Sequence, residues 1–270
     1  MRMWCREIAG LVLPAGCAGC GRAGGALCGR CREVLCGAGA RPVRPSPAPP
    51  GLPPVHAAAA YEDEARAVLL AHKERGELRL AAALGEALAG AVGAAGARSG
   101  GERPLLLVPV PSARRAVAAR GHDPARRIAL AAAGVLRRGG RPARVLPVLR
   151  QLRAVTDQAG LDARRRRENL TGALGAVPRC GRLLAEGPVV LVDDLMTTGA
   201  SLAEAARAVR AAGGLVTGAA VVAAAPRAFA MVAARSFTRV AAPSPSGTEY
   251  ERASLLMISG RKHLIGGTCQ

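Results

Sequence analysis

The stretch 188–225 is the part of this 270-residue sequence that most constrains the fold. Val189 to Val192 form an apolar, mostly β-branched run, which is typical of a strand buried on both faces of a parallel sheet. A Gly-free, Ala-rich segment as far as Ala212 predicts a helix, and Gly213 and Gly214 end it before a second buried-strand pattern. A strand, a helix and a strand in this order predict an α/β fold with a parallel sheet flanked by helices.

The connection between the first strand and the helix carries two adjacent acids and a group of hydroxyls. Asp193 and Asp194 form the acidic turn that we expect directly after the strand. The hydroxyl-rich loop that follows consists of Thr197, Thr198, Gly199, Ala200 and Ser201. We expect the helix to begin at this loop with a hydroxyl-rich cap. Free backbone N–H groups at a helix start, with hydroxyl donors and no bulky side chain nearby, make a site for a phosphate.

The two carboxylates suit a different part of the same ligand. They would repel a phosphate, so we expect them to accept hydrogen bonds from neutral hydroxyls or to hold Mg²⁺ through water. A sugar phosphate offers both a phosphate and vicinal hydroxyls. The loop has neither the G-x-x-x-x-G-K-[ST] motif of nucleoside-triphosphate sites nor the G-x-G-x-x-G motif of dinucleotide sites. The alternative is an ordinary connection without a ligand.

The sequence VVLVDDLMTTGAS, residues 189–201, resembles the phosphoribosyl-pyrophosphate (PRPP) signature of type I phosphoribosyltransferases. In that family the paired acids contact the ribose hydroxyls and the following loop holds the 5′-phosphate. By position, the resemblance gives the first role to Asp193 and Asp194 and the second to residues 197–201. It also implies a type I phosphoribosyltransferase-like sheet that binds PRPP together with Mg²⁺.

Six of the eight cysteines fall between Cys5 and Cys36. Four of them form two C-x-x-C pairs, and these are Cys17, Cys20, Cys28 and Cys31. Two such pairs can surround a tetrahedral ion, and four thiolates favour structural Zn²⁺. A disulfide framework is the alternative, which a cytoplasmic location disfavours. Cys5 and Cys36 are left over, and either of them could replace a ligand.

These patterns divide the chain into four parts. Residues 1–40 are predicted to be a small cysteine-rich zinc module. Residues 41–54 contain seven prolines and predict a semi-rigid linker. Residues 55–234 are predicted to be the phosphoribosyltransferase-like domain, and the Ser, Pro and Gly content of 235–270 indicates a disordered tail.

The remaining pattern predicts the other elements of the large domain. Helices are expected from about Tyr61 to a break at 73–76, over 78–92 and over 125–136, with strands over 105–108 and 145–149. The strand at 105–108 runs into a proline turn, which places the arginines that follow at the ligand-binding edge of an open sheet. Residues 151–171 predict either a loop that closes over a polyphosphate or a charged surface helix. His72, on an apolar helix face, is either structural or catalytic.

Four shorter motifs resemble the ComF family, a competence-associated group of phosphoribosyltransferase relatives with an N-terminal zinc module. They are AHKERG (71–76), VPVPS (108–112), ARGHD (119–123) and the spacing of Gln158, Leu161, Arg166 and Asn169. The resemblance implies a role in DNA uptake during natural transformation. The sequence departs from the family at 120–124, where R-G-F-N-Q is replaced by R-G-H-D-P, and at Glu74, where an aromatic residue is usual.

Charge and composition limit the partners. The net charge is +19, and residues 114–167 hold fifteen Arg against three Asp. Such a surplus attracts polyphosphate or nucleic acid, although 36 of the 38 basic residues are Arg, as a GC-rich coding bias would also produce. Only 2% of residues are aromatic, which argues against stacking platforms for single-stranded DNA. We expect no membrane span, no signal peptide and a cytoplasmic location.

Three functions follow as hypotheses. The first is a phosphoribosyltransferase, in which a nitrogen nucleophile attacks PRPP and pyrophosphate leaves, with Lys73, Arg75 and Arg120 as candidates for holding the pyrophosphate. The second is a non-catalytic protein that senses PRPP or handles single-stranded DNA with DNA-processing partners, through its zinc module and basic surface. The third is a salvage enzyme whose cysteine module pairs subunits, as in a homodimer.

Overall fold

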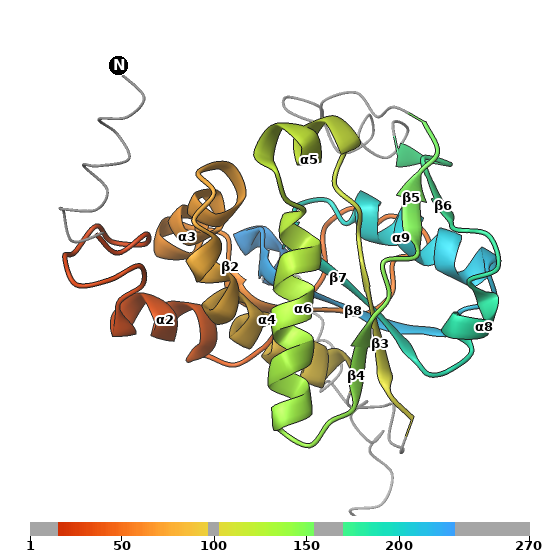
Figure 1. Ribbon diagram of the computed structural model, residues 1–270, viewed down its shortest axis with the longest axis horizontal. Helices are drawn as coiled ribbons and strands as arrows, with labels where there is room; N and C mark the ends of the chain where they lie inside the picture. Colours follow the sequence, from red (N-terminus) through yellow and green to blue (C-terminus); the bar gives the residue numbers. More distant parts are fainter. Residues whose placement is uncertain (1–15, 97–102, 154–169, 230–270) are drawn as a thin grey trace, which may run out of the picture.

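The computed structural model describes residues 16–96, 103–153 and 170–229. Cys5, most of the predicted loop at 151–171 and the predicted tail at 235–270 lie outside the described residues. Within them, the chain forms an α/β fold with a mostly parallel, mixed sheet flanked by helices (Figure 1). The predicted fold class is thereby confirmed at this level.

The main sheet has six strands in the order β1-β2-β8-β7-β3-β4. In that order their bounds are Arg41–Val43, Val55–Ala60, Val216–Ala224, Val189–Met196, Leu105–Pro109 and Ala143–Val145. The strand β1 is antiparallel to β2, and every other neighbouring pair is parallel. The strand β7 lies at the centre, between β8 and β3, as expected from an apolar run that is buried on both faces.

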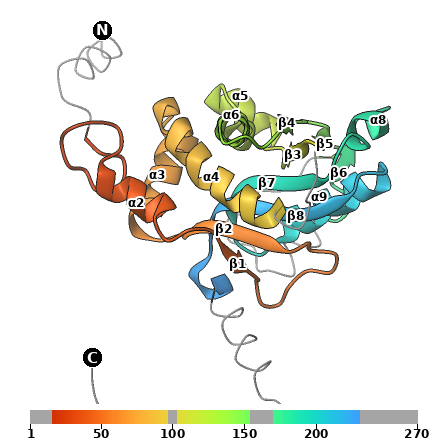
Figure 2. The same cartoon turned by 90° about the horizontal axis from the view of Figure 1, so that it is seen from below.

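Alternate residues of β7 face two different hydrophobic cores. Val190 and Val192 pack in the core formed with α4 (Ala81–Gly96) and α6 (Pro124–Arg138) on one face of the sheet (Figure 2). Val189 and Leu191 pack on the other face, in the core that contains the apolar side of α9 (Ala200–Ala211). The short α8 (Gly181–Leu184) contributes the buried Leu184 to this second core. The period of two along the strand thus positions helices on both faces.

The predicted strand over 145–149 is wrong. The structure has β4 ending at Val145 in the main sheet, and β5 (Leu149–Gln151) pairing with β6 (Leu174–Ala176) in a separate antiparallel ribbon. Pro147 lies between the two strands and has no N–H to donate, so the ladder breaks there and the chain changes sheets.

The cysteine-rich segment packs directly on the large domain. Its helix α2 (Gly29–Cys36) contacts α3 (Asp63–Glu74), α4 and β2, and Leu35 is fully buried in the core with them. Figure 1 shows α2 lying beside α3. The range 41–54, predicted as a linker, includes the edge strand β1 and the buried Pro45, so it is attached to the domain for part of its length.

One stretch of the described chain, Leu78–Gly96, is long and apolar enough to cross a membrane by length and composition. It consists of a 3₁₀ turn, η1 (Leu78–Leu80), and α4. Because α4 packs against α6 and β8 and most of its residues are buried inside the protein, the stretch serves as a core helix.

Candidate functional site

A cleft of about 370 Å³ opens where the carboxyl ends of β3 and β7 lie side by side. The N–H of Val110, just after β3, donates to the Val192 carbonyl at 2.9 Å and fixes this edge. The cleft is lined by Lys73, Val110, Pro111, Ser112, Ala113, Ala116, Arg120, Gln151, Leu170, Leu174, Asp193, Asp194, Leu195, Thr197 and Ser201. A polar cleft at the carboxyl edge of a parallel sheet is the usual ligand position in such folds.

The two acids lie within β7 instead of in a turn after it. The strand continues to Met196, and Asp193 pairs with Val221 of β8. The pairing continues because β8 is also long and apolar at this level, so the predicted acidic turn is wrong. Both carboxyl groups nevertheless line the cleft. Asp194 is 6% exposed, so its charge has to be balanced by a partner inside the protein.

That partner is Lys73, which lies 121 positions earlier in the last turn of α3. Its Nζ donates to Asp194 Oδ2 at 2.8 Å. Burial disfavours the charged lysine, but the nearby Asp194 carboxylate outweighs it and raises the pKa of Lys73. The structure therefore joins a predicted pyrophosphate residue to a predicted ribose residue.

Asp193 has a different environment. The backbone N–H of Asp194 donates to Asp193 Oδ1 at 2.9 Å. Burial, and then the charge of the adjacent Asp194, raise the pKa of Asp193 well above its usual value of 3.8. An acid held in this way favours a ligand that brings a cation or hydroxyl donors.

The loop after β7 leads into α9 through a left-handed glycine. Gly199 has φ +75° and precedes the first residue of α9. A Cβ at this position would lie 3.1 Å from Leu52 and 3.3 Å from Pro45, so the predicted linker packs against this loop. The predicted hydroxyl cap is wrong, since Gly199 occupies the cap position and makes no side-chain bond. A glycine there lets the backbone turn tightly into the helix.

The hydroxyls of this loop divide between the cleft and the backbone. Thr197 and Ser201 line the cleft. Thr198 Oγ1 instead accepts from the N–H of Ala200 at 3.5 Å, and Thr198, Gly199 and Ala200 are not among the lining residues. Two hydroxyls of this loop therefore lie in the cleft, beside the N-terminus of α9.

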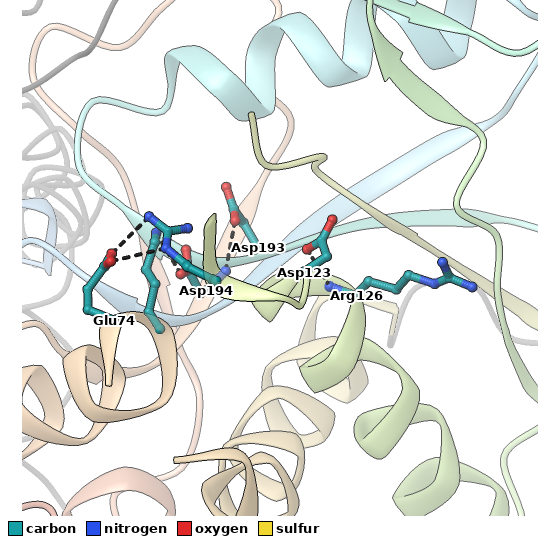
Figure 3. A network of polar contacts seen from close by, with 7 residues as sticks. Glu74, Asp123, Arg126, Asp193 and Asp194 are labelled. Atoms are coloured by element: carbon teal, nitrogen blue, oxygen red, sulfur yellow. Dashed lines mark hydrogen bonds and ion pairs between the residues drawn. The ribbon is translucent and has the colours of Figure 1, made fainter. Parts of the chain in front are cut away.

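Of the three candidates for holding pyrophosphate, two line the cleft and one does not. Arg120 ends α5 (Arg114–Arg120) and lines the cleft. Its Nε and Nη2 donate to the two carboxylate oxygens of Glu74, each at 3.0 Å (Figure 3). Arg75 is exposed, lies outside the cleft lining and donates to the Ala67 carbonyl at 3.5 Å. Lys73 and Arg120 are therefore the two candidates that the structure brings together.

Several residues of the cleft were not chosen from the sequence. Ser112 and Gln151 line it from the proline turn and from β5, and Glu74 reaches it through Arg120. Asp123, in the departure from the ComF pattern, has a structural role, because its Oδ1 accepts from the Arg126 N–H at 3.2 Å and caps α6. Figure 3 shows the Arg126 side chain pointing away from the paired carboxyl groups. Only the proline turn before Ser112 carried a sequence signal for this wall.

The contacts of His72 fit the structural alternative. It is fully buried, its Nδ1 lies 3.3 Å from the Glu77 carbonyl, and its ring lies 5.5 Å from that of His122. Burial lowers the pKa of His72, because the charged imidazolium would lose its hydration there. The pair joins the end of α3 to the turn after Arg120, next to the ion pair of Arg120 with Glu74.

A second site lies at the N-terminal end of the described chain. The Sγ atoms of Cys17, Cys20, Cys28 and Cys31 all lie within 4.8 Å of one another. Cys20 Sγ and Cys28 Sγ are 3.7 Å apart, which fits the spacing of about 3.8 Å expected for thiolates on a tetrahedral Zn²⁺ with Zn–S bonds of about 2.3 Å. These four cysteines can therefore hold a metal ion such as zinc, and Cys36 is not part of the group.

The backbone around the cysteines prepares them for a metal. Although burial alone would raise the pKa of Cys17, backbone N–H groups, that of Cys28 among them, lower it to about 6. Burial raises the pKa of Cys31, so this thiol would ionise only with a cation beside it. A Cβ on Gly19 would lie 2.7 Å from Cys31 Sγ, so glycine leaves room for the cluster.

The two sites are independent in sequence and in chemistry, since one offers oxygen ligands and charged side chains and the other offers thiolates. The first suits a polar organic ligand, and the second suits a structural ion. No family model matches this chain and neither does any curated protein, so the geometry of these two sites carries the functional argument.

Proposed function

We propose that this chain is a ComF-like phosphoribosyltransferase-domain protein that binds PRPP with Mg²⁺ in the cleft at the end of β7. The observation that supports the proposal is that one cleft combines the paired acids, two loop hydroxyls, Lys73 and Arg120. These groups come from separate parts of the chain, and each suits a different part of PRPP. The resemblance of residues 189–201 to the PRPP signature points the same way.

Each part of the ligand has residues that suit it. The 5′-phosphate would lie at Thr197 and Ser201, beside the N-terminus of α9, where hydroxyls and the helix dipole favour an anion. The ribose hydroxyls would donate to Asp193 and Asp194. The pyrophosphate would extend toward Lys73 and Arg120, since both side chains line the same cleft.

The carboxyl groups also fit Mg²⁺. Magnesium is typically bound by one or two protein carboxylates together with substrate phosphates and water. Asp193 and Asp194 supply two such groups, and because burial and the adjacent Asp194 raise the pKa of Asp193, a bound cation would favour its ionised form. When bound, Mg²⁺ would neutralise charge on the pyrophosphate and help it to leave.

If transfer occurs, the chain's task is to hold both ends of PRPP while a nitrogen nucleophile attacks the anomeric carbon. Fixing the 5′-phosphate and the hydroxyls orients the ribose for that attack. Lys73 and Arg120 would stabilise the negative charge that develops on the leaving pyrophosphate. In this role the protein is a pentosyl-transferring glycosyltransferase.

Calorimetric titration with PRPP and Mg²⁺ tests the proposal. We expect saturable binding to the wild-type protein and none to a variant with Asp193→Asn and Asp194→Asn. Asp63→Asn is the matched control, because Asp63 is exposed, lies outside the cleft and has φ +40°, which asparagine tolerates. Equal binding by the wild-type protein and the double variant, or no binding at millimolar PRPP, would contradict the proposal.

A second function is favoured by the exposed arginines of α5 and α6, among them Arg114, Arg115, Arg126 and Arg127. They belong to the sequence range 114–167, which carries most of the basic surplus, and they suit the phosphates of single-stranded DNA. On this alternative, PRPP is sensed or not used, and the protein works with DNA-processing partners in DNA uptake in the cytoplasm. Binding to an oligonucleotide that falls steeply with added salt, with no release of pyrophosphate from PRPP, would favour this function.

A further inference from the structure

Arg120 is already engaged by a carboxylate of its own chain. Its guanidinium gives two parallel hydrogen bonds to Glu74, and the Arg120 side chain is only 22% exposed. Glu74 is the last residue of α3 and directly follows Lys73. The ion pair therefore joins α3 to the end of α5 at the cleft (Figure 3). The donors that would grip a phosphate are the ones that grip this carboxylate.

The other cation of the cleft is also paired, since Lys73 donates to Asp194. Glu74, Asp193 and Asp194 thus give three carboxyl groups against the two cations, Lys73 and Arg120. The chain as a whole carries a net charge of +19, yet these groups together provide no positive surplus. A polyanion gains a cation here only by displacing a carboxylate.

Glu74 is the carboxylate that a ligand can displace. It is 47% exposed, whereas Asp194 is 8% exposed in its side chain and belongs to the proposed ribose site. A phosphate accepts the planar fork of Arg120 with the same geometry as a carboxylate and with more negative charge. A ligand with only a 5′-phosphate, held at Thr197 and Ser201, has no group to offer Arg120.

We infer that Glu74 is a positioning residue that keeps the Arg120 guanidinium paired until the diphosphate group of a ligand displaces it, and so weakens the binding of diphosphate ligands without affecting ligands that carry only a 5′-phosphate. The inference deepens the proposed function and rests on it for the location of the ligand.

Calorimetry with inorganic pyrophosphate and Mg²⁺ tests the inference directly. Glu74→Gln keeps the shape of the side chain and removes its charge. We expect pyrophosphate to bind this variant roughly fivefold more tightly than the wild-type protein, because one exposed ion pair no longer has to be broken. Ribose 5-phosphate should bind both proteins equally. Glu77→Gln is the matched control, since Glu77 pairs with Arg79 at 3.7 Å outside the cleft.

A second pair of proteins separates release of Arg120 from a general effect of charge. In an Arg120→Gln background, the further change Glu74→Gln should give no gain in pyrophosphate affinity. A gain that persists without Arg120 overturns the inference, and so does equal or undetectable pyrophosphate binding by the wild-type protein and Glu74→Gln. If Glu74→Gln tightens pyrophosphate binding while PRPP binds to none of the proteins, the proposed function fails and the role of Glu74 stands.

Discussion

At the scale of single residues, Asp193 is a carboxyl group that the fold stabilises poorly. Burial and the adjacent Asp194 raise its pKa well above 3.8. A raised folded-state pKa stabilises the fold below the unfolded-state pKa, and this contribution is lost as the pH rises through the folded-state pKa. At neutral pH, the protein therefore carries a cost that a ligand or cation would relieve.

Asp193→Asn should remove that cost. The amide stays neutral, so we expect the free energy of unfolding to rise by about 1 kcal/mol and the Tm by about 2–4 °C at neutral pH. The gain should shrink toward about pH 4, where the carboxyl group of the wild-type protein is protonated as well. The same variant should lose PRPP binding. Thermal melts across this pH range, beside calorimetry, measure both effects.

Asp63→Asn is again the control and should leave the Tm within about 1 °C, as an exposed surface change does. A Tm for Asp193→Asn below that of the wild-type protein at every pH would show that the carboxylate stabilises the fold. Gain of stability with loss of binding is what distinguishes a ligand-binding acid from a structural one.

The pairings of these residues could not be predicted from the sequence. Asp193 and Asp194 are recognisable because they follow a strand pattern and precede a hydroxyl loop. The contact of Asp194 with Lys73 joins positions 121 apart and depends on where the tertiary fold places the end of α3. The contact of Arg120 with Glu74 likewise depends on the tertiary fold, which brings the end of α5 to the end of α3. Local sequence patterns identify the chemical groups, but tertiary packing determines which of these groups come into contact.

At the scale of elements, the contact between α4 and α6 depends on a glycine. A Cβ on Gly85 would lie 2.4 Å from Ala131 Cβ and 2.9 Å from the backbone N of Ala132. Gly85→Ala should therefore force the helices apart and cost about 2–3 kcal/mol, as overpacking a tight core does. Urea unfolding measures the loss.

Gly90 lies on the same helix and is a matched control, because a Cβ at this position would meet no neighbouring element of the described chain within 4 Å. Gly90→Ala should stabilise the protein by up to about 1 kcal/mol through helix propensity. Equal effects of the two substitutions would show that the close approach of α4 and α6 does not limit stability. Because α6 begins just after the turn that follows Arg120, the first variant, Gly85→Ala, should also weaken ligand binding.

The elements that were predicted well are those with long, regular patterns. Seven elements have bounds within a few residues of the predicted ones, apart from β7, which extends further at its end. They are the helices at 63–74, 81–96, 124–138 and 200–211 and the strands β3, β7 and β8. The strands β1 and β2 and the helix α5 were not predicted. The strand β2 reads VHAAAA, whose alanines favour a helix, and its pairing with β8 and β1 makes it a strand.

At the scale of the whole molecule, the cysteine segment is part of the large domain's surface. Leu35 of α2 is fully buried in the core that also contains α4 and β2. Arg30 and Arg32 of the same segment form ion pairs with Glu64 of α3 and Glu86 of α4. A metal that orders residues 17–31 therefore also keeps α2 in place beside the N-terminal end of α3, the helix that carries Lys73 and Glu74 at its other end.

Loss of the metal should show this connection. Cys31 and Cys36 both lie in α2, but only Cys31 belongs to the four-cysteine group. We expect Cys31→Ser to abolish stoichiometric zinc and to cost about 4 kcal/mol, lowering the Tm by about 8 °C or more, since a metal at 1,000 times its Kd stabilises by about that amount. Cys36→Ser should retain zinc and cost about 1 kcal/mol, because its half-buried thiol packs against apolar neighbours.

Metal analysis, thermal melts and hydrogen exchange would measure the difference, with faster exchange in α2 and α3 for Cys31→Ser. Retention of one zinc per chain by Cys31→Ser, or its loss from Cys36→Ser, would contradict this ligand set. Exchange that rises in α2 alone would show instead that the segment can detach without disturbing the helix of Lys73.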